Sequence, residues 1–130
     1  YIFMDCQYIE IGCRSNEAVF DEFAPSLTVM STIVNDYFPG ALTTDAGTKA
    51  LTLNKPGPWV IGEKGFTYTA SSDEFGSIKY ETAGRSYKVG DRLELIAPHC
   101  DPVVNEYDVI HAIRKERVEA VWPIAARGRE

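Results

Sequence analysis

The sequence lacks several features that would each place it in a class of proteins. Its three cysteines, Cys6, Cys13 and Cys100, lie far apart and form no C-x-x-C pair, which argues against a disulfide framework and a cysteine-rich zinc site. No apolar run approaches the roughly 18–20 residues of a membrane-spanning helix, and no signal-peptide pattern opens the chain. Basic residues are fewer than acidic ones, 13 against 19, and the net charge of −6 leaves no basic face for phosphates. We therefore expect a cytoplasmic protein whose partners are small molecules or proteins, with no nucleic acid and no membrane.

What the sequence does contain fits one ordinary globular domain. Its 130 residues are 45% hydrophobic and 25% charged, which is enough for a single buried core. The first residues, Tyr1 to Met4, read like the middle of a strand instead of a natural start. We expect one domain over residues 1–130 that is a piece of a longer polypeptide.

Short segments rich in β-branched and aromatic residues, separated by Gly, Pro, Asn and Asp, predict a mainly β fold with a compact, barrel-like sheet. The predicted strands lie near residues 1–5, 26–35, 40–45, 59–62, 66–70, 76–81, 91–97, 107–114 and 117–122. One short helix is predicted over residues 16–23. The last two strands are predicted to form a hairpin through a four-residue connection built on a type I turn, because residues 114–117 contain no glycine.

The most informative motif is PHCDPVVN at residues 98–105, which sets an imidazole and a carboxylate two positions apart. On an extended backbone His99 and Asp101 project to one side and Cys100 to the other. Nitrogen and oxygen ligands suit a divalent ion such as Zn²⁺ or Mn²⁺. Two protein ligands would leave open positions for water or substrate. As a pattern alone the motif is a weak signal, because H-x-D is common, and a loop histidine beside a turn aspartate explains it better.

Four stretches, taken together and in order, carry a more specific signal. They are YIFMDCQY at 1–8, DAGTKAL at 45–51, GDRLEL at 90–95 leading into PHCDPVVN, and VWPIAARG at 121–128. This set resembles the C-terminal domain of the metal-activated, pyridoxal-phosphate-dependent D-threonine aldolase and D-serine dehydratase family, which includes 3-hydroxy-D-aspartate aldolases and dehydratases.

The resemblance implies an alanine-racemase-like enzyme in which an N-terminal α/β barrel binds pyridoxal phosphate through a lysine and a C-terminal β-domain completes the active site. This chain would be the second part, in an enzyme that is a homodimer at full length. In that family an H-x-D or H-x-C pair holds the metal, so His99 and Asp101 inherit the metal-ligand and catalytic roles, and Cys100 does not. The metal would be Mn²⁺, Zn²⁺ or Mg²⁺.

The resemblance also implies the chemistry. A β-hydroxy-D-amino acid substrate would place its hydroxyl near the ion, which acts as a Lewis acid either in aldol cleavage, giving glycine and an aldehyde, or in elimination of water. The aspartate ligand favours D-threonine or 3-hydroxy-D-aspartate aldolase over a D-serine or 3-hydroxyaspartate dehydratase. A different class also fits the residues: a non-catalytic β-barrel that serves as a binding or assembly module.

Further candidates surround this motif. Residues 72–76 resemble an acidic S-x-E-H-G segment of the family, in which Asp73 or Glu74 would lie near the metal or orient one of its ligands. Phe75 replaces the histidine of that segment, and a solvated acidic turn explains these residues equally well. Asp45, Gly47 and Lys49 are candidates for the domain junction, with Gly47 permitting close backbone approach. Lys49 is better explained as a surface charge than as the cofactor lysine.

The remaining aromatic and polar residues have simpler explanations. Gln7 and Tyr8 are candidates for the cofactor pocket, and Asn105 for a brace of the ligand loop. His111 fits a structural or surface histidine of a strand. Trp59 and Trp122 fit core or interface positions.

Overall fold

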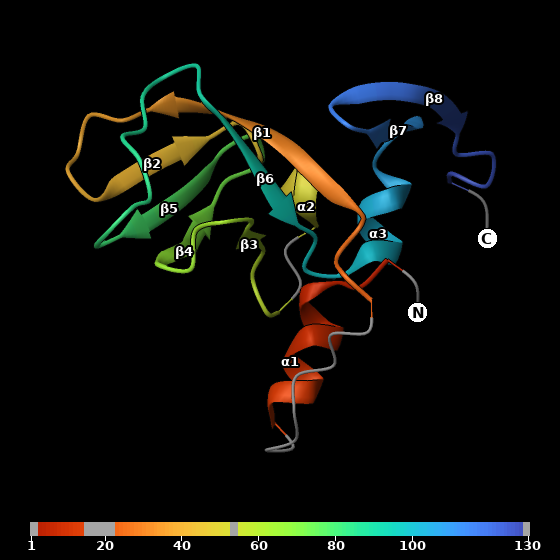
Figure 1. Cartoon of the computed structure of the whole chain (residues 1–130), viewed down its shortest axis with the longest axis horizontal. Coiled ribbons are helices and arrows are strands. Elements are labelled where there is room, and N and C mark those ends of the chain that lie inside the picture. The colour runs from red at the N-terminus through yellow and green to blue at the C-terminus, as the bar shows by residue number, and fades with distance from the viewer. Residues whose placement is uncertain (1–2, 15–22, 53–54, 129–130) are drawn as a thin grey trace.

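The computed structural model describes residues 3–14, 23–52 and 55–128, and within them the chain is mainly β (Figure 1). The helices in these described ranges are α1 (Cys6–Arg14), α2 (Thr48–Leu51) and α3 (Cys100–Asn105). The strands are β1 (Thr28–Asn35), β2 (Ala41–Thr44), β3 (Trp59–Val60), β4 (Phe66–Ser71), β5 (Gly76–Tyr80), β6 (Arg92–Ile96), β7 (Val109–Arg114) and β8 (Arg117–Pro123).

Six strands form one antiparallel sheet in the order β3-β6-β1-β2-β5-β4. Its two edge strands, β3 and β4, approach each other, so the sheet curls into a nearly closed barrel. The interior is filled by apolar side chains from the strands and from α2 and α3, namely Val29, Ile33, Leu42, Leu51, Ile78, Leu93, Leu95 and Val103. Burial of these side chains is the main force that holds the barrel together. The expected mainly β, barrel-like fold is confirmed.

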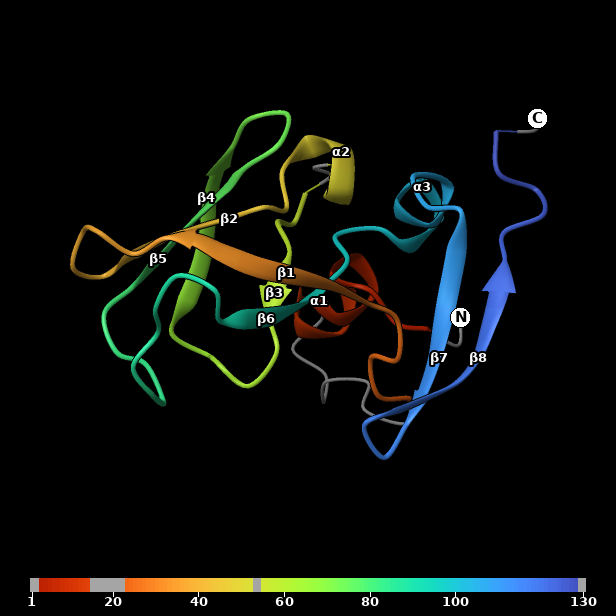
Figure 2. The same ribbon diagram turned by 90° about the horizontal axis from the view of Figure 1, so that it is seen from above.

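The other two strands form a separate hairpin, β7–β8, which follows α3 and stands apart from the barrel (Figure 2). Large apolar side chains remain exposed along it, including Ile113, Val118, Val121 and Trp122, of which Trp122 is 57% exposed. An isolated two-stranded hairpin is at best marginally stable in water. The hairpin therefore presents a surface that a further part of a larger protein can cover.

Most predicted strands are confirmed within a few residues, but two local predictions differ from the structure and a third falls outside the described residues. The strand expected at 1–5 is wrong for residues 3–5, which are irregular and lead directly into α1. The helix expected over 16–23 falls on residues outside the described ranges, apart from Phe23. The hairpin has a two-residue turn instead of a four-residue one, with Lys115 and Glu116 at φ 48° and 62°, because a turn with both central residues at positive φ matches the twist of the strands.

Candidate functional site

The histidine of the H-x-D motif lies in the short connection between β6 and α3. His99 occupies the N-cap position of α3 with extended backbone angles, φ −149° and ψ 120°. The chain is thus extended only as far as His99, and Asp101 belongs to the first turn of the helix. The prediction of an extended backbone through the whole motif is wrong, because the helix begins at Cys100.

The two side chains of the motif nevertheless lie on the same side of the chain. His99 Nε2 is 3.7 Å from Asp101 Oδ2, and the side chains are 28% and 70% exposed. Cys100, between them, is buried in the core. The helical turn gives the same grouping that an extended backbone would have given: imidazole and carboxylate face solvent together, and the thiol faces inward.

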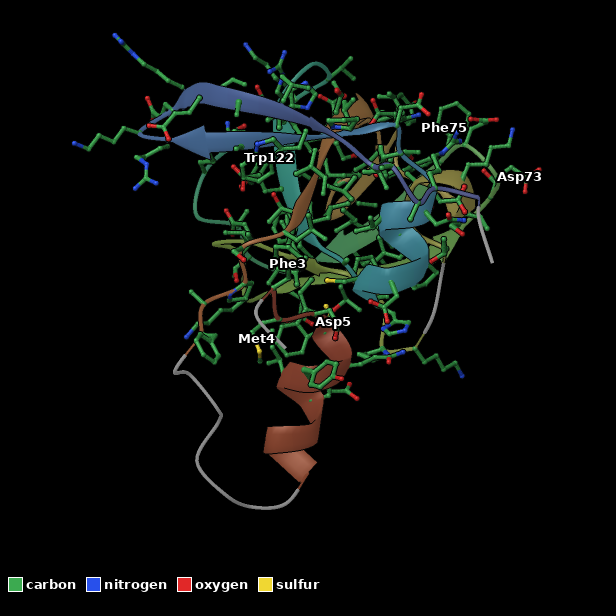
Figure 3. All side chains as sticks on the ribbon, turned by 90° about the vertical axis from the view of Figure 1, so that its right-hand side faces the viewer. Phe3, Met4, Asp5, Asp73, Phe75 and Trp122 are labelled. Carbon is green, nitrogen blue, oxygen red and sulfur yellow. The ribbon has the colours of Figure 1, made fainter. Side chains whose placement is uncertain are left out.

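A third residue, Asp5, completes this group from the other end of the chain. Asp5 is fully buried, and its Oδ2 lies 3.2 Å from His99 Nδ1 and accepts a 2.9 Å hydrogen bond from Cys100 N. Its other oxygen, Oδ1, accepts a 3.1 Å hydrogen bond from Tyr8 N, as expected of a residue that caps the N-terminus of α1. Figure 3 shows Asp5 at the start of α1, next to α3.

The segment that carries Asp5 is tied to the end of β6. Cys6 N donates to Ala97 O at 3.0 Å, and Gln7 N donates to Pro98 O at 3.3 Å. Met4, the preceding residue, is buried and has a φ of 53°, a conformation that costs an L-residue roughly 1–2 kcal/mol. These contacts fix the place of the Asp5 carboxylate beside the motif.

Sequence reasoning missed Asp5, although a signal for it was present. An aspartate directly before a run with apolar residues at helical spacing is a typical helix start. That signal predicts the cap of α1, but it does not predict that the second oxygen reaches His99, which is 94 residues away.

The chemistry of this group fits a divalent metal ion. His99 Nε2 and Asp101 Oδ2 are the donor types that Zn²⁺ and Mn²⁺ accept, and both are accessible to solvent. The other imidazole nitrogen is held by a carboxylate, as is usual for metal-binding histidines. Among the residues that the structure describes, no group of three or more His, Cys, Asp or Glu side chains is arranged around one point. An ion held by this pair would keep open coordination positions.

The acidic candidates gather in a different place. An open pocket of about 280 Å³ lies beside α2 and is lined by Val29, Met30, Asp45, Ala46, Lys49, Ala50, Asp73, Glu74 and Tyr107. Figure 3 shows Asp73 and Phe75 well apart from Asp5, and Asp73 and Glu74 line this pocket, whereas His99 and Asp101 do not. The reason is topological, because residues 72–75 pack on the start of α2, where Thr48 N donates to Ser72 O at 2.9 Å.

Within this pocket Lys49 forms an ion pair with Glu74. The hydrogen bond from Lys49 to Glu74 raises the pKa of the lysine above its usual value. A lysine that forms an imine must lose its proton, so a partner that stabilises the protonated amine makes Lys49 unsuited to that role. The expectation of a surface charge agrees with its exposed position.

Gly47 permits close approach of two backbones, as expected. A methyl group built on it would lie 2.4 Å from Ser72 O, 2.6 Å from Phe75 N and 2.7 Å from Asp73 O. Asp45 also has a structural role, because its Oδ1 accepts hydrogen bonds from Ser31 Oγ at 2.9 Å and Thr32 N at 2.7 Å.

The other candidates lie outside the metal-ligand group. Gln7 Nε2 donates to Lys55 O at 3.1 Å, and Tyr8 is 41% exposed. Asn105 ends α3 and accepts a 2.7 Å hydrogen bond from Gly128 N, so it braces the C-terminal segment instead of the ligand loop. His111 is an exposed residue of β7.

The two cysteines whose side chains the structure describes, Cys6 and Cys100, are buried. Burial raises the pKa of the Cys6 thiol to about 12, which makes it an inert thiol. The side chain of Cys13 lies outside the described residues. In the described part of the chain no helix is both long and apolar enough to cross a membrane.

Comparison with known proteins gives consistent matches. Residues 26–113 match the family model described as a serine dehydratase domain. The chain is 35% identical over 128 residues to D-threonine aldolase from Arthrobacter sp. and 33% identical over 130 residues to 3-hydroxy-D-aspartate aldolase from Paracoccus denitrificans. These matches include 98% and 99% of this chain, respectively, but only 33% of the length of each relative. The chain therefore spans about a third of the length of these relatives.

Solved structures give the same fold. A D-threonine aldolase from Filomicrobium marinum matches with a TM-score of 0.84 and 28% identity, over 97% of this chain and 34% of that one. An alanine-racemase-like protein from Idiomarina loihiensis matches with a TM-score of 0.70 and 18% identity, over 92% of this chain and 35% of that one. The barrel and its hairpin are therefore the fold of a domain found in alanine-racemase-like enzymes.

Proposed function

The chain belongs to the serine dehydratase domain family, and from this premise we propose that it is the C-terminal domain of a lyase that acts on β-hydroxy-D-amino acids and depends on a divalent metal and pyridoxal phosphate. The observation that carries the proposal is the His99–Asp101 pair, with Nε2 and Oδ2 3.7 Å apart at the surface. The names of the two aldolase relatives support the reaction class.

In this proposal His99 and Asp101 hold the ion and leave its other positions to water or substrate. When bound, the ion supplies Lewis acidity toward the substrate hydroxyl, and the cofactor supplies an acceptor for the electrons of the bond that breaks. The task of this chain is orientation. The imidazole is held at the start of α3, and the exposed carboxylate of Asp101 adds negative charge beside it. Rigid placement of the ligands determines which bond of the substrate lies close to the ion.

Aldol cleavage is the favoured reaction. Its support is the aspartate at the second ligand position, together with the aldolase relatives at 33% and 35% identity. Dehydration is the second candidate, because the matching family model is described as a serine dehydratase domain. Cleavage of 3-hydroxy-D-aspartate gives glycine and glyoxylate, whereas loss of water leads to release of ammonia, so product analysis separates the two.

The proposal requires a second domain, an N-terminal α/β barrel that holds the cofactor, in an enzyme that forms a homodimer. Two observations support this second domain: the chain covers only about 33% of the length of each relative, and the β7–β8 hairpin exposes an apolar surface. Lys49 is unsuited to the role of the lysine that binds the cofactor, because it forms an ion pair with Glu74.

The test uses the full-length protein loaded with pyridoxal phosphate and Mn²⁺. His99→Ala and Asp101→Ala should each reduce aldehyde release from D-threonine or 3-hydroxy-D-aspartate by at least about 100-fold, because each removes a ligand of the ion. Glu81→Ala is the control, since this exposed carboxylate follows β5 of the barrel sheet and belongs neither to the group around His99 nor to the β7–β8 hairpin, and it should retain activity. Retained activity in His99→Ala would contradict the proposal and leave the non-catalytic binding module as the better explanation.

A second test uses the 130-residue chain alone. We expect no aldehyde from D-threonine when pyridoxal phosphate and Mn²⁺ are supplied, because the residues that hold the cofactor belong to the other domain. Turnover by the isolated chain would contradict the proposal that the other domain holds the cofactor.

A further inference from the structure

We propose that Asp5 is a positioning residue that holds the His99 imidazole with its proton on Nδ1, so that Nε2 is the nitrogen presented to a metal ion. The inference rests on the proposed function, because it takes His99 as a metal ligand. It adds a residue from the opposite end of the chain to the group at the start of α3.

The first step is the chemistry of the contact. An ionised carboxylate only accepts hydrogen bonds, and a neutral imidazole carries one N–H. Asp5 Oδ2 lies 3.2 Å from His99 Nδ1, so this contact is favourable only when Nδ1 carries the proton. The lone pair is then on Nε2, the atom that lies 3.7 Å from Asp101 Oδ2.

The second step is the rigidity of the carboxylate. Asp5 is fully buried, and Tyr8 N and Cys100 N donate to its two different oxygens at 3.1 and 2.9 Å. These two backbone donors fix both the position and the rotation of the carboxylate plane. A fixed acceptor in a water-poor environment orients the imidazole more strongly than a solvated one would.

The third step separates this role from simple helix capping. Capping α1 requires one oxygen, and Oδ1 serves it through Tyr8 N. The second oxygen, Oδ2, accepts a hydrogen bond from Cys100 N at the start of α3 and also contacts the imidazole. Burying a charged carboxylate costs free energy unless its hydrogen bonds are satisfied. A serine or threonine would cap α1 without this cost. The second carboxylate oxygen is accounted for by its two contacts at the start of α3, with Cys100 N and with His99 Nδ1.

The experiment measures the tautomer and the metal affinity separately. In metal-stripped full-length protein labelled with ¹⁵N-histidine, the His99 signals are those that disappear in His99→Ala. At pH 8 they should show a protonated Nδ1 in the parent protein and a shift toward protonated Nε2 in Asp5→Ala. Calorimetry with Zn²⁺ alone should give a Kd raised by about 10–100-fold in Asp5→Ala.

Asp5→Asn is the conservative variant, because its amide oxygen can replace one acceptor without the charge. It should keep the Nδ1–H tautomer and weaken Zn²⁺ binding by at least about threefold, less than Asp5→Ala does. If Asp5→Ala does not fold, this loss of affinity in Asp5→Asn decides the question. Thr44→Val is the control, because it removes another buried polar group, the Thr44 hydroxyl on β2, and should leave both tautomer and Kd at their parent values.

Three results would overturn the inference: an unchanged tautomer in Asp5→Ala, a Zn²⁺ Kd in Asp5→Asn equal to that of the parent, or an equal loss of affinity in Thr44→Val. Failure of the metal site itself would look different. In that case His99→Ala and Asp101→Ala would bind Zn²⁺ as tightly as the parent, while the tautomer would still report on the contact between Asp5 and His99.

Discussion

Replacing Gly47 by alanine tests how tightly the loop at 72–75 is packed on α2. The φ of Gly47 is −96°, which alanine adopts readily, so the effect of the substitution is steric and not conformational. The new methyl group would lie 2.4–2.7 Å from three backbone atoms of the loop, and backbone cannot rotate away as a side chain can. The loop must therefore move.

The magnitude follows from what this movement disrupts. Overpacking of a close contact costs about 1–3 kcal/mol. The loop also accepts two backbone hydrogen bonds, Thr48 N to Ser72 O at 2.9 Å and Lys49 N to Asp73 O at 3.1 Å, and complete loss of each would cost about 0.5–1.5 kcal/mol. Complete loss of both would bring the total to about 2–6 kcal/mol; because the two bonds are weakened and not lost, we expect Gly47→Ala to lower the free energy of unfolding by about 2–4 kcal/mol.

Urea unfolding of the 130-residue chain, followed by far-ultraviolet circular dichroism, measures this change as a fall of about 1–2 M in the midpoint. Gly57→Ala is the matched control, because the nearest atom to its new methyl group is Tyr68 O at 3.7 Å, an ordinary contact. Its free energy of unfolding should stay unchanged or rise by up to about 1 kcal/mol. A loss below about 0.5 kcal/mol in Gly47→Ala would refute the steric reasoning.

Three further predictions concern ionisation and the hairpin turn. Hydrogen bonds from the Tyr87 hydroxyl and the Gly84 N–H lower the pKa of Glu63 below 4.5, so the stability that these bonds give the folded protein is present above that pH and is lost as pH falls through the folded pKa. Tyr87→Phe should therefore raise the Glu63 pKa in an NMR titration, and an unchanged pKa would contradict this. Cys6, with a pKa of about 12 raised by burial, should resist alkylation at pH 8 until urea unfolds the chain, as mass spectrometry of the peptide can show. Glu116→Gly should raise the melting temperature by an amount equivalent to about 0.5–1 kcal/mol, because the φ of 62° at this position suits glycine. A lower melting temperature would argue against the two-residue turn.

Local pattern was sufficient to predict most of the strands. Alternation of side chains and the turn residues between strands are properties of neighbouring positions, so β1, β5 and β6 were predicted within two residues of their observed bounds. The same local reasoning failed at residues 3–14. There the apolar residues before Asp5 resemble a strand, and the helix becomes evident only when Asp5 is recognised as its cap.

By itself the sequence pointed to the pair His99 and Asp101, whose Nε2 and Oδ2 lie 3.7 Å apart because the backbone at His99 is still extended where the helix begins. Only the tertiary structure decided what surrounds them. Asp5 reaches His99 across 94 positions because backbone hydrogen bonds join the start of α1 to the end of β6. The acidic residues at 73 and 74 lie elsewhere because their loop packs on α2. Such placements depend on contacts between distant segments, which periodicity and spacing along the chain do not encode.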